Sequence, residues 1–299
     1  MDFNLMAAVR SALPKNKYWL MAANDGSNDP SSGSSRHSES TGNKDVCQAS
    51  LMQILESQII PSLLAANEFT EPFYSTDGAR TALPTESEIS NFAELSTGLD
   101  EEAPNLFVQG LMAEGLGSEA IFLHLLAPAA RHLGYLWDED LCDFSKVTIG
   151  LLRMQKITLR LGSDFQEKRK SALEGMRALF APVPGSQHTL GVLMVSEFFR
   201  REGWQVWMEL GSSESMLLAA VKKDWFQVIG LSVGTEAQVE PMAEIIRHIR
   251  AASANPKVKI LIGGPLLALL PNLYKEVGAD AAADDAKSAV ELAKTFFTP

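Results

Sequence analysis

The sequence predicts two folded domains, an N-terminal helical bundle followed by an α/β domain with a doubly wound parallel sheet. Two observations predict this fold class. Apolar residues recur at spacings of three and four between about residues 46 and 161, which is typical of amphipathic helices. Beyond residue 170, short apolar runs rich in β-formers alternate with helical segments, as in parallel sheets with crossover helices. The chain has 299 residues, enough for two domains of ordinary size.

The N-terminal stretch differs from the rest of the chain. Residues 23–45 contain almost no large apolar side chains. Such a segment cannot offset its ordering entropy by burial. We therefore expect residues 1–45 to be a flexible tail, residues 46–170 a helical bundle cap, and residues 171–299 the α/β domain.

Five helices are expected in the cap. The first covers residues 46–67 and contains Pro61, which favours a kink. The others are expected at residues 86–99, 103–114, 119–137 and 139–161. Thr85 and Ser118 are candidate N-caps, and Pro128 falls inside the fourth helix. Short connections between these segments favour a bundle.

Five strands are expected in the α/β domain, at residues 178–183, 204–210, 227–233, 258–262 and 279–283. In open parallel sheets, ligands bind beyond the carboxyl ends of the strands. His188, Ser232 and the pair Gly263-Gly264 each follow a predicted strand. We therefore expect the functional site at this edge.

Composition excludes several classes of protein. The net charge of −11 argues against a surface that grips nucleic-acid phosphates. The two cysteines, Cys47 and Cys142, suit a reducing cytoplasm without a disulfide framework. No apolar run reaches the ~18 residues of a membrane span, and no secretory signal pattern is present. P-loop, HExxH and CxxC motifs are also absent, and we expect a cytoplasmic protein that is not an enzyme.

The run GSQHTLG, residues 185–191, resembles the GDxHxxG signature of cobalamin-binding domains. The runs Gly230-Leu231-Ser232 and Ile262-Gly263-Gly264-Pro265 resemble further elements of that family in the same order, and VGADAAADDAKSAVELAK resembles its closing strand and helix. The resemblance implies a flavodoxin-like, Rossmann-like sheet, with His188 as the lower axial ligand of cobalt and thus the metal-binding residue. The cofactor-binding residues that it implies are Gly185, Ser186, Gln187, His188, Thr189, Leu190, Gly191, Ser232, Gly234, Gly263 and Gly264.

The chain departs from that family in several places. Ser186 replaces the aspartate that orients the ligand histidine, and a hydroxyl supplies no carboxylate charge. Gly234 replaces the usual leucine of the second loop. The cap resembles the bundle that covers cobalamin in methionine synthase and in light-sensing repressors, which implies a cofactor contact for Trp137. Val147-Thr148 falls where that bundle has its Glu-His pair. His124 and His132 lie eight residues apart on the preceding helix, near one face, and either could reach cobalt.

From residue 46 to the C-terminus, the chain resembles the AerR/PpaA antirepressor family of photosynthetic proteobacteria, which is related to the AppA sensor domain. The resemblance implies a light-responsive regulator of transcription that binds cobalamin and antagonises the CrtJ/PpsR repressor of photosystem genes. Two alternatives stay open. One is a corrinoid methyl-carrier protein or mutase subunit, against which Ser186 argues. The other is a sensor that binds heme, because imidazole ligates iron as well as cobalt.

Overall fold

The C-terminal domain is built on a five-stranded parallel sheet of order β2-β1-β3-β4-β5. The strands are β1 (Arg177–Pro182), β2 (Gln205–Met208), β3 (Val228–Ser232), β4 (Lys259–Gly263) and β5 (Ala281–Ala282). This computed structural model describes residues 82–167, 175–184, 186, 189–211 and 213–297. Each predicted strand is confirmed, with its ends within two residues of the expected ones. The strand order places the topological switch point between β1 and β3.

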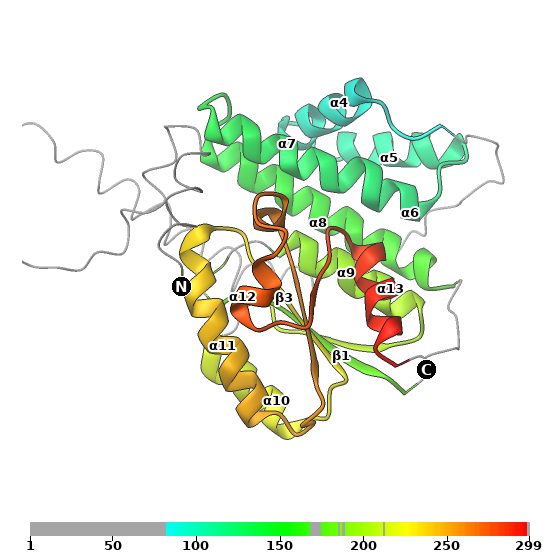
Figure 1. Cartoon of the computed structure of the whole chain (residues 1–299). Helices are drawn as coiled ribbons and strands as arrows, with labels where there is room; N and C mark the ends of the chain where they lie inside the picture. The colour runs from blue at the N-terminus through cyan, green and yellow to red at the C-terminus, as the bar shows by residue number, and fades with distance from the viewer. Residues whose placement is uncertain (1–81, 168–174, 185, 187–188, 212, 298–299) are drawn as a thin grey trace, which may run out of the picture.

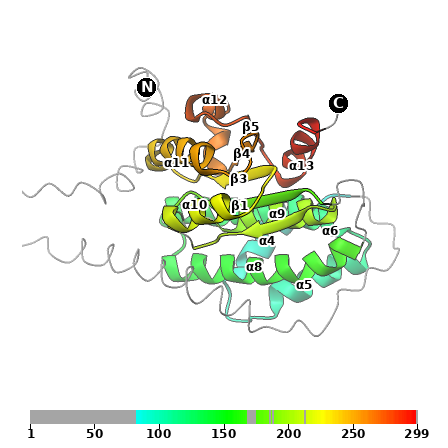
Figure 2. The same ribbon diagram turned by 90° about the horizontal axis from the view of Figure 1, so that it is seen from below.

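Helices cover both faces of the sheet (Figures 1 and 2). The helices α9 (Leu190–Arg201) and α13 (Ala286–Thr295) pack together on one face. The other face carries α10 (Glu214–Lys223), α11 (Val239–Ala252) and α12 (Leu273–Val277). Successive β1 side chains alternate between the two layers, with Phe180 in the core beside α9 and Leu179 in the core beside α11.

The helical region lies against the α9 and α13 side of the sheet (Figure 1). It consists of α4 (Glu86–Thr97), α5 (Ala103–Ala113), α6 (Ser118–Ala120), α7 (Ala127–Asp138) and α8 (Phe144–Glu167). The long helix α8 packs along α9 and joins the two domains. The two regions share one hydrophobic core, which includes Phe122 of the helical region and Phe198 of α9.

Local chemistry explains where several of these helices begin. Thr85 caps α4 as predicted, and its side chain and that of Glu88 form a capping box. Ser118 is the first residue of α6 rather than its N-cap, which is Gly117, so this prediction was wrong. Asp140 adopts a φ of 56°, and the side chain of Asp143 accepts a hydrogen bond from the Lys146 N–H. The turn at these residues delays the start of α8 to Phe144, five residues later than expected.

A π-helix, η4 (Ile121–Leu126), joins α6 to α7. Pro128 has no N–H to donate, and the Ala127 N–H reaches back to the carbonyl of Phe122. The expectation that His124 and His132 share a face assumed a regular α-helix, and that premise is wrong here. His124 is exposed, whereas the half-buried His132 ring stacks on Tyr135 with centroids 6.4 Å apart.

Several predictions lie outside the described residues. They are the tail at residues 1–45, the helix at residues 46–67 and the domain boundary near residue 170. Among the residues that the structure does describe, no helix is both long enough and apolar enough to span a membrane.

Candidate functional site

Three of the predicted site segments meet at the carboxyl edge of the sheet. The Val183 N–H donates to the Ser232 carbonyl at 2.9 Å, and the Val233 N–H donates to the Gly263 carbonyl at 2.9 Å. These bonds align the ends of β1, β3 and β4 side by side. The Ser186 N–H then donates to the Val183 carbonyl at 2.8 Å, which turns the chain immediately after β1. The sequence prediction of one shared edge is confirmed for these segments.

Gly264, which directly follows β4, has a structural reason of its own. Gly264 has a φ of 114°, and a Cβ built there would lie 2.2 Å from the Val233 carbonyl oxygen. A Cβ on Gly263 would make only an ordinary contact, 3.6 Å from the Ala283 oxygen. The close approach that demands glycine at 264 is therefore to the β3 loop, and no cofactor is needed to explain it.

The signature loop is described only in part. Gly185, Gln187 and His188 lie outside the described residues. Thr189 is buried, at 3% exposure, just ahead of α9. Leu190 packs in the core shared by the two domains, whereas Gly191 lies on the exposed side of α9.

The other predicted contacts occupy varied surroundings. Ser232 is half-buried at the end of β3, and the Gly234 N–H donates to Gln238 Oε1 at 2.8 Å. Trp137 is half-buried in the last turn of α7, against the edge of the shared core. The cofactor contacts of these residues stay predictions.

Val147 and Thr148, which stand where the resembled bundle has its Glu-His pair, are buried residues. Val147 and Thr148 are 4% and 5% exposed in the first turns of α8. The Thr148 hydroxyl donates to the Phe144 carbonyl at 2.8 Å, within its own helix. These side chains therefore contribute to the helical core.

Sequence reasoning missed Gln155, which connects the helical region to the signature loop. Gln155 is 3% exposed on α8, and its Nε2 donates to Thr189 Oγ1 at 2.9 Å. Its Oε1 is shielded from solvent and has no hydrogen-bond partner among the described residues. The available signal was a polar residue on the buried stripe of α8, between Met154 and Ile157.

Glu236 was also missed. It opens the short 3₁₀ helix η5 (Glu236–Gln238), four residues beyond the end of β3. Both of its carboxylate oxygens are shielded from solvent, and neither has a hydrogen-bond partner in the described part of the chain. A buried carboxylate without a donor is costly, so this arrangement implies a missing partner.

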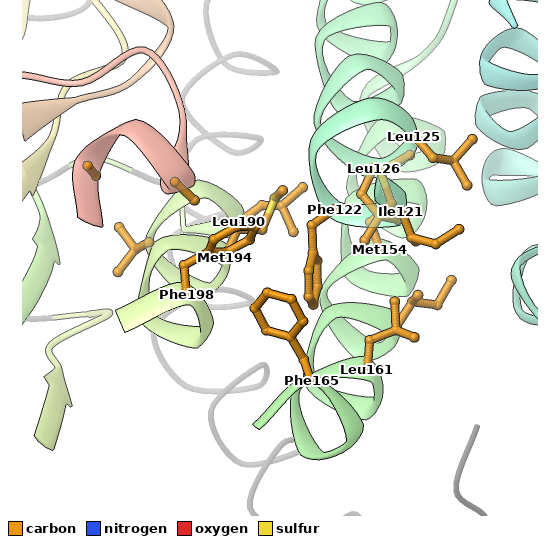
Figure 3. Packing of buried hydrophobic residues seen from close by; sticks show 14 of the residues in the cluster. Ile121, Phe122, Leu125, Leu126, Met154, Leu161, Phe165, Leu190, Met194 and Phe198 are labelled. Atoms are coloured by element: carbon orange, nitrogen blue, oxygen red, sulfur yellow. The ribbon is translucent and has the colours of Figure 1, made fainter. Parts of the chain in front are cut away.

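Aromatic packing joins the helical region to the α/β domain (Figure 3). The Phe122 ring centroid lies 5.2 Å from that of Phe165 and 5.9 Å from that of Phe198, and the Phe165 and Phe198 centroids are 4.9 Å apart. The three rings come from η4, α8 and α9. Contacts of this kind resist independent movement of the two domains.

An ion cluster closes the same interface. Glu119 of α6 accepts hydrogen bonds from Arg201 of α9 and Lys287 of α13, each at 2.7 Å. Desolvation raises the pKa of Glu119, but the bonds from Lys287 and Arg201 outweigh it and hold the pKa below its usual value. The Arg201 guanidinium also lies 4.3 Å from the Phe165 ring centroid.

Comparison with known families finds a match for the C-terminal domain. Residues 176–293 match the model of the B12 binding domain. Over these residues the chain is similar to B12 binding domains. An uncharacterized 20.5 kDa protein in the bchF-crtJ intergenic region of Rhodobacter capsulatus is 28% identical over 167 residues, which span 56% of this chain and 86% of that protein.

The fold also resembles a solved corrinoid protein. The Methanosarcina barkeri monomethylamine corrinoid protein aligns over 71% of this chain and 100% of its own, with a TM-score of 0.61 and 15% sequence identity. The likeness extends beyond residues 176–293, which match the family model, into the helical region. It confirms the predicted pairing of a helical region with an α/β domain.

The residues at the carboxyl edge fit a corrinoid. A corrinoid ring carries amide side chains, whose N–H groups are hydrogen-bond donors. Gln155 Oε1 and the Glu236 oxygens are buried acceptors that lack donors in the described residues. Together with the B12-binding domain match, these acceptors support a corrinoid cofactor at this edge.

Proposed function

We propose that this protein is a cobalamin-dependent, light-responsive antirepressor that acts on a CrtJ/PpsR-type repressor of photosystem genes. One observation carries the proposal. The buried hydrogen bond from Gln155 of α8 to Thr189 ties the helical region to the residue that follows His188. A change in the position of the signature loop would therefore act directly on α8 of the helical region through this hydrogen bond.

The residues present define the roles in this proposal. His188 would ligate cobalt, and Ser186 would orient the histidine ring with a hydroxyl in place of a carboxylate. A bound cobalamin would supply a light-absorbing cobalt centre with an exchangeable ligand. Gln155 and Thr189 hold the loop against α8, and the three phenylalanines and the Glu119 cluster hold α8 and α6 against the α/β domain. A shift of the loop would then bias two arrangements of the helical region, which the repressor would distinguish.

The relative from Rhodobacter capsulatus supports the regulatory reading. That protein lies in the bchF-crtJ intergenic region, and it matches more than half of this chain. The absence of a Glu-His pair at Val147-Thr148 leaves no assisting base at those positions. Both features favour a regulatory protein over a methyltransferase component.

The experiment begins with the full chain and hydroxocobalamin. We expect a bound corrinoid spectrum that changes when His188 is replaced by Ala, and repressor binding that differs between dark and illuminated samples. His248→Ala is a matched control, because that exposed histidine bonds to Glu214 on the opposite helical layer. An unchanged spectrum and affinity in His188→Ala would refute the axial-ligand role. Equal repressor binding in dark and light would refute the light response.

A corrinoid methyl carrier is the second candidate. The fold shared with the monomethylamine corrinoid protein favours it, although at 15% identity the likeness concerns the fold alone. Ser186 argues against it, because a carboxylate at that position tunes the histidine through turnover. Transfer of a methyl group from the methylated corrinoid on this protein to an acceptor would support this candidate.

A further inference from the structure

We propose that Glu236 and Gln155 select a tetrapyrrole with amide side chains and reject one with carboxylate side chains. The inference rests on the proposed function, since it concerns the same cofactor site. It concerns the heme alternative directly, because heme carries propionate carboxylates whereas cobalamin carries amides. The site would therefore take corrinoids and exclude heme on electrostatic grounds.

Two of the described side chains with unpaired acceptors lie beside loops of the carboxyl edge. Gln155 Oε1 and both oxygens of Glu236 are shielded acceptors without partners in the described part of the chain. Gln155 is fixed beside the signature loop by its bond to Thr189, and Glu236 follows β3 at the same edge. An amide N–H satisfies these acceptors. An ionised carboxylate cannot, because it has no proton to donate.

The loops of this edge also carry negative charge. The loops after the five strands are residues 183–189, 209–213, 233–238, 264–272 and 283–285. They contain no Lys or Arg but contain Glu209, Glu236, Asp284 and Asp285. An anionic side chain that enters this edge meets like charge without a compensating cation from these loops.

Three cations on the neighbouring helices are engaged by other groups. Arg153 of α8 donates to the carbonyls of Ser96 and Gly98, and Lys156 of α8 bonds to Glu101 at 2.8 Å. Lys287 of α13 bonds to Glu119 of the helical region. These three side chains therefore do not neutralise the negative charge of the edge loops.

The lack of donors to the shielded Glu236 carboxylate, within the described part of the chain, favours a ligand-binding role over a structural one. A purely structural carboxylate would be held by donors, as Glu119 is, whereas Glu236 has none in the described residues. Removing its charge should thus stabilise the cofactor-free protein and weaken discrimination between ligands. A structural role predicts a loss of stability instead.

The test compares two tail-less corrinoids with the full chain. Cobinamide carries amide side chains, whereas cobyrinic acid carries carboxylates on the same ring, and hemin is a third probe. We expect the wild-type protein to bind cobinamide in preference to cobyrinic acid and hemin. In Glu236→Gln the preference should fall by about tenfold or more, the range set by one charged hydrogen bond. Gln155→Leu should weaken cobinamide binding with a smaller change in preference, since it removes a neutral acceptor.

A charge-matched variant and a stability measurement serve as controls. Glu240→Gln makes the same charge change at an exposed position on α11 and should leave the preference unchanged. The cofactor-free Glu236→Gln protein should unfold at a higher temperature than wild type. A preference unchanged by Glu236→Gln, a less stable Glu236→Gln protein, or wild-type affinities that are equal for the two corrinoids would each overturn the inference.

The outcomes also distinguish the selection role from the proposed function. If hydroxocobalamin binding depends on His188 but Glu236→Gln keeps the wild-type preference for amides, only the selection role is refuted. Repressor binding that does not change with light would refute the antirepressor proposal but not the selection role. A wild-type protein that binds hemin but no corrinoid would overturn both.

Discussion

The side chain of Gln155 on α8 donates a hydrogen bond of 2.9 Å to the hydroxyl of Thr189, which follows His188 in the chain. Both residues are 3% exposed. The bond crosses from the helical region to the α/β domain and spans 34 positions of sequence. Because it is buried, its loss leaves a polar group without water as a substitute.

Replacing Thr189 by Val should therefore lower the free energy of unfolding by about 1–3 kcal/mol, since the Gln155 amide is left without its acceptor. Urea denaturation of the cofactor-free protein measures this change. Thr189→Ser keeps the hydroxyl and should lose much less stability.

Thr158→Val provides the matched comparison for this prediction. Thr158 is fully buried on the same helix, but its hydroxyl donates to the Met154 carbonyl, one turn back. Removing this hydroxyl leaves no other described side chain without a hydrogen-bond partner. We therefore expect a smaller loss in the free energy of unfolding than for Thr189→Val. In a double-mutant cycle, additive effects of Gln155→Leu and Thr189→Val would show that the two side chains do not interact.

The Glu119 cluster should make the domain interface sensitive to acid. The pKa of Glu119 is lowered in the folded protein below its ordinary value of 4.5, so its contribution is present above that value. It is lost as the pH falls through the folded pKa. Glu119→Gln should therefore reduce the free energy of unfolding by on the order of 1 kcal/mol at pH 7, with a difference that shrinks below about pH 4.5.

Denaturation of both proteins between pH 3 and pH 7 gives the measurement. Glu244→Gln is a fitting control, because the Glu244–Arg247 pair lies on the surface with side chains 59% and 68% exposed. Exposed pairs contribute little, so this variant should stay close to wild type at every pH. A Glu119→Gln deficit that persists undiminished at pH 3 would contradict the electrostatic explanation.

The fold was largely predictable from the sequence because its signals are local. Period and composition located the strands to within two residues and the N-cap at Thr85. The start of α8 was misplaced because nothing in the pattern distinguishes the turn at Asp140 from a first helical turn. The π-helix before Pro128 was not predicted for a related reason. A proline within a helical pattern is compatible with a kink, a break or a bulge.

The arrangement of the carboxyl edge was predictable only in part. The positions of His188, Ser232 and the glycine pair just after predicted strands identified the carboxyl edge, and their contacts with a cofactor stay predictions. Gln155 and Glu236 gave no comparable signal, because their importance lies in partners across the domain interface or in the lack of partners. Those relationships are tertiary, and no spacing along the chain encodes them.

Gly162 of α8 should not tolerate even a methyl group. A Cβ at this position would lie 2.5 Å from Glu197 Oε2, and Glu197 is a buried residue of α9 that also pairs with Gln166 and Arg200. Overpacking of this kind costs about 1–3 kcal/mol, more than the helix propensity that alanine gains. Gly162→Ala should therefore destabilise the protein in chemical denaturation.

Gly110→Ala tests the same exchange without the crowding. Gly110 lies in α5, and a Cβ there would meet nothing within 4 Å. Alanine should thus raise the free energy of unfolding by up to about 1 kcal/mol. If Gly162→Ala were equally stabilising, the close approach of α8 and α9 would not be a constraint.

Gly264 should be the least replaceable glycine of the carboxyl edge. Alanine there combines a φ of 114° with a Cβ placed 2.2 Å from the Val233 carbonyl oxygen, so both strain and overlap oppose it. Gly278 isolates the first effect, since its φ is 79° but its Cβ would lie 3.9 Å from the nearest atom, Ile246 Cγ2. Gly278→Ala should cost about 1–2 kcal/mol from left-handed backbone strain, and Gly264→Ala clearly more. Denaturation and corrinoid titration of both variants measure this, and equal losses would mean that the loops of β3 and β4 separate without cost.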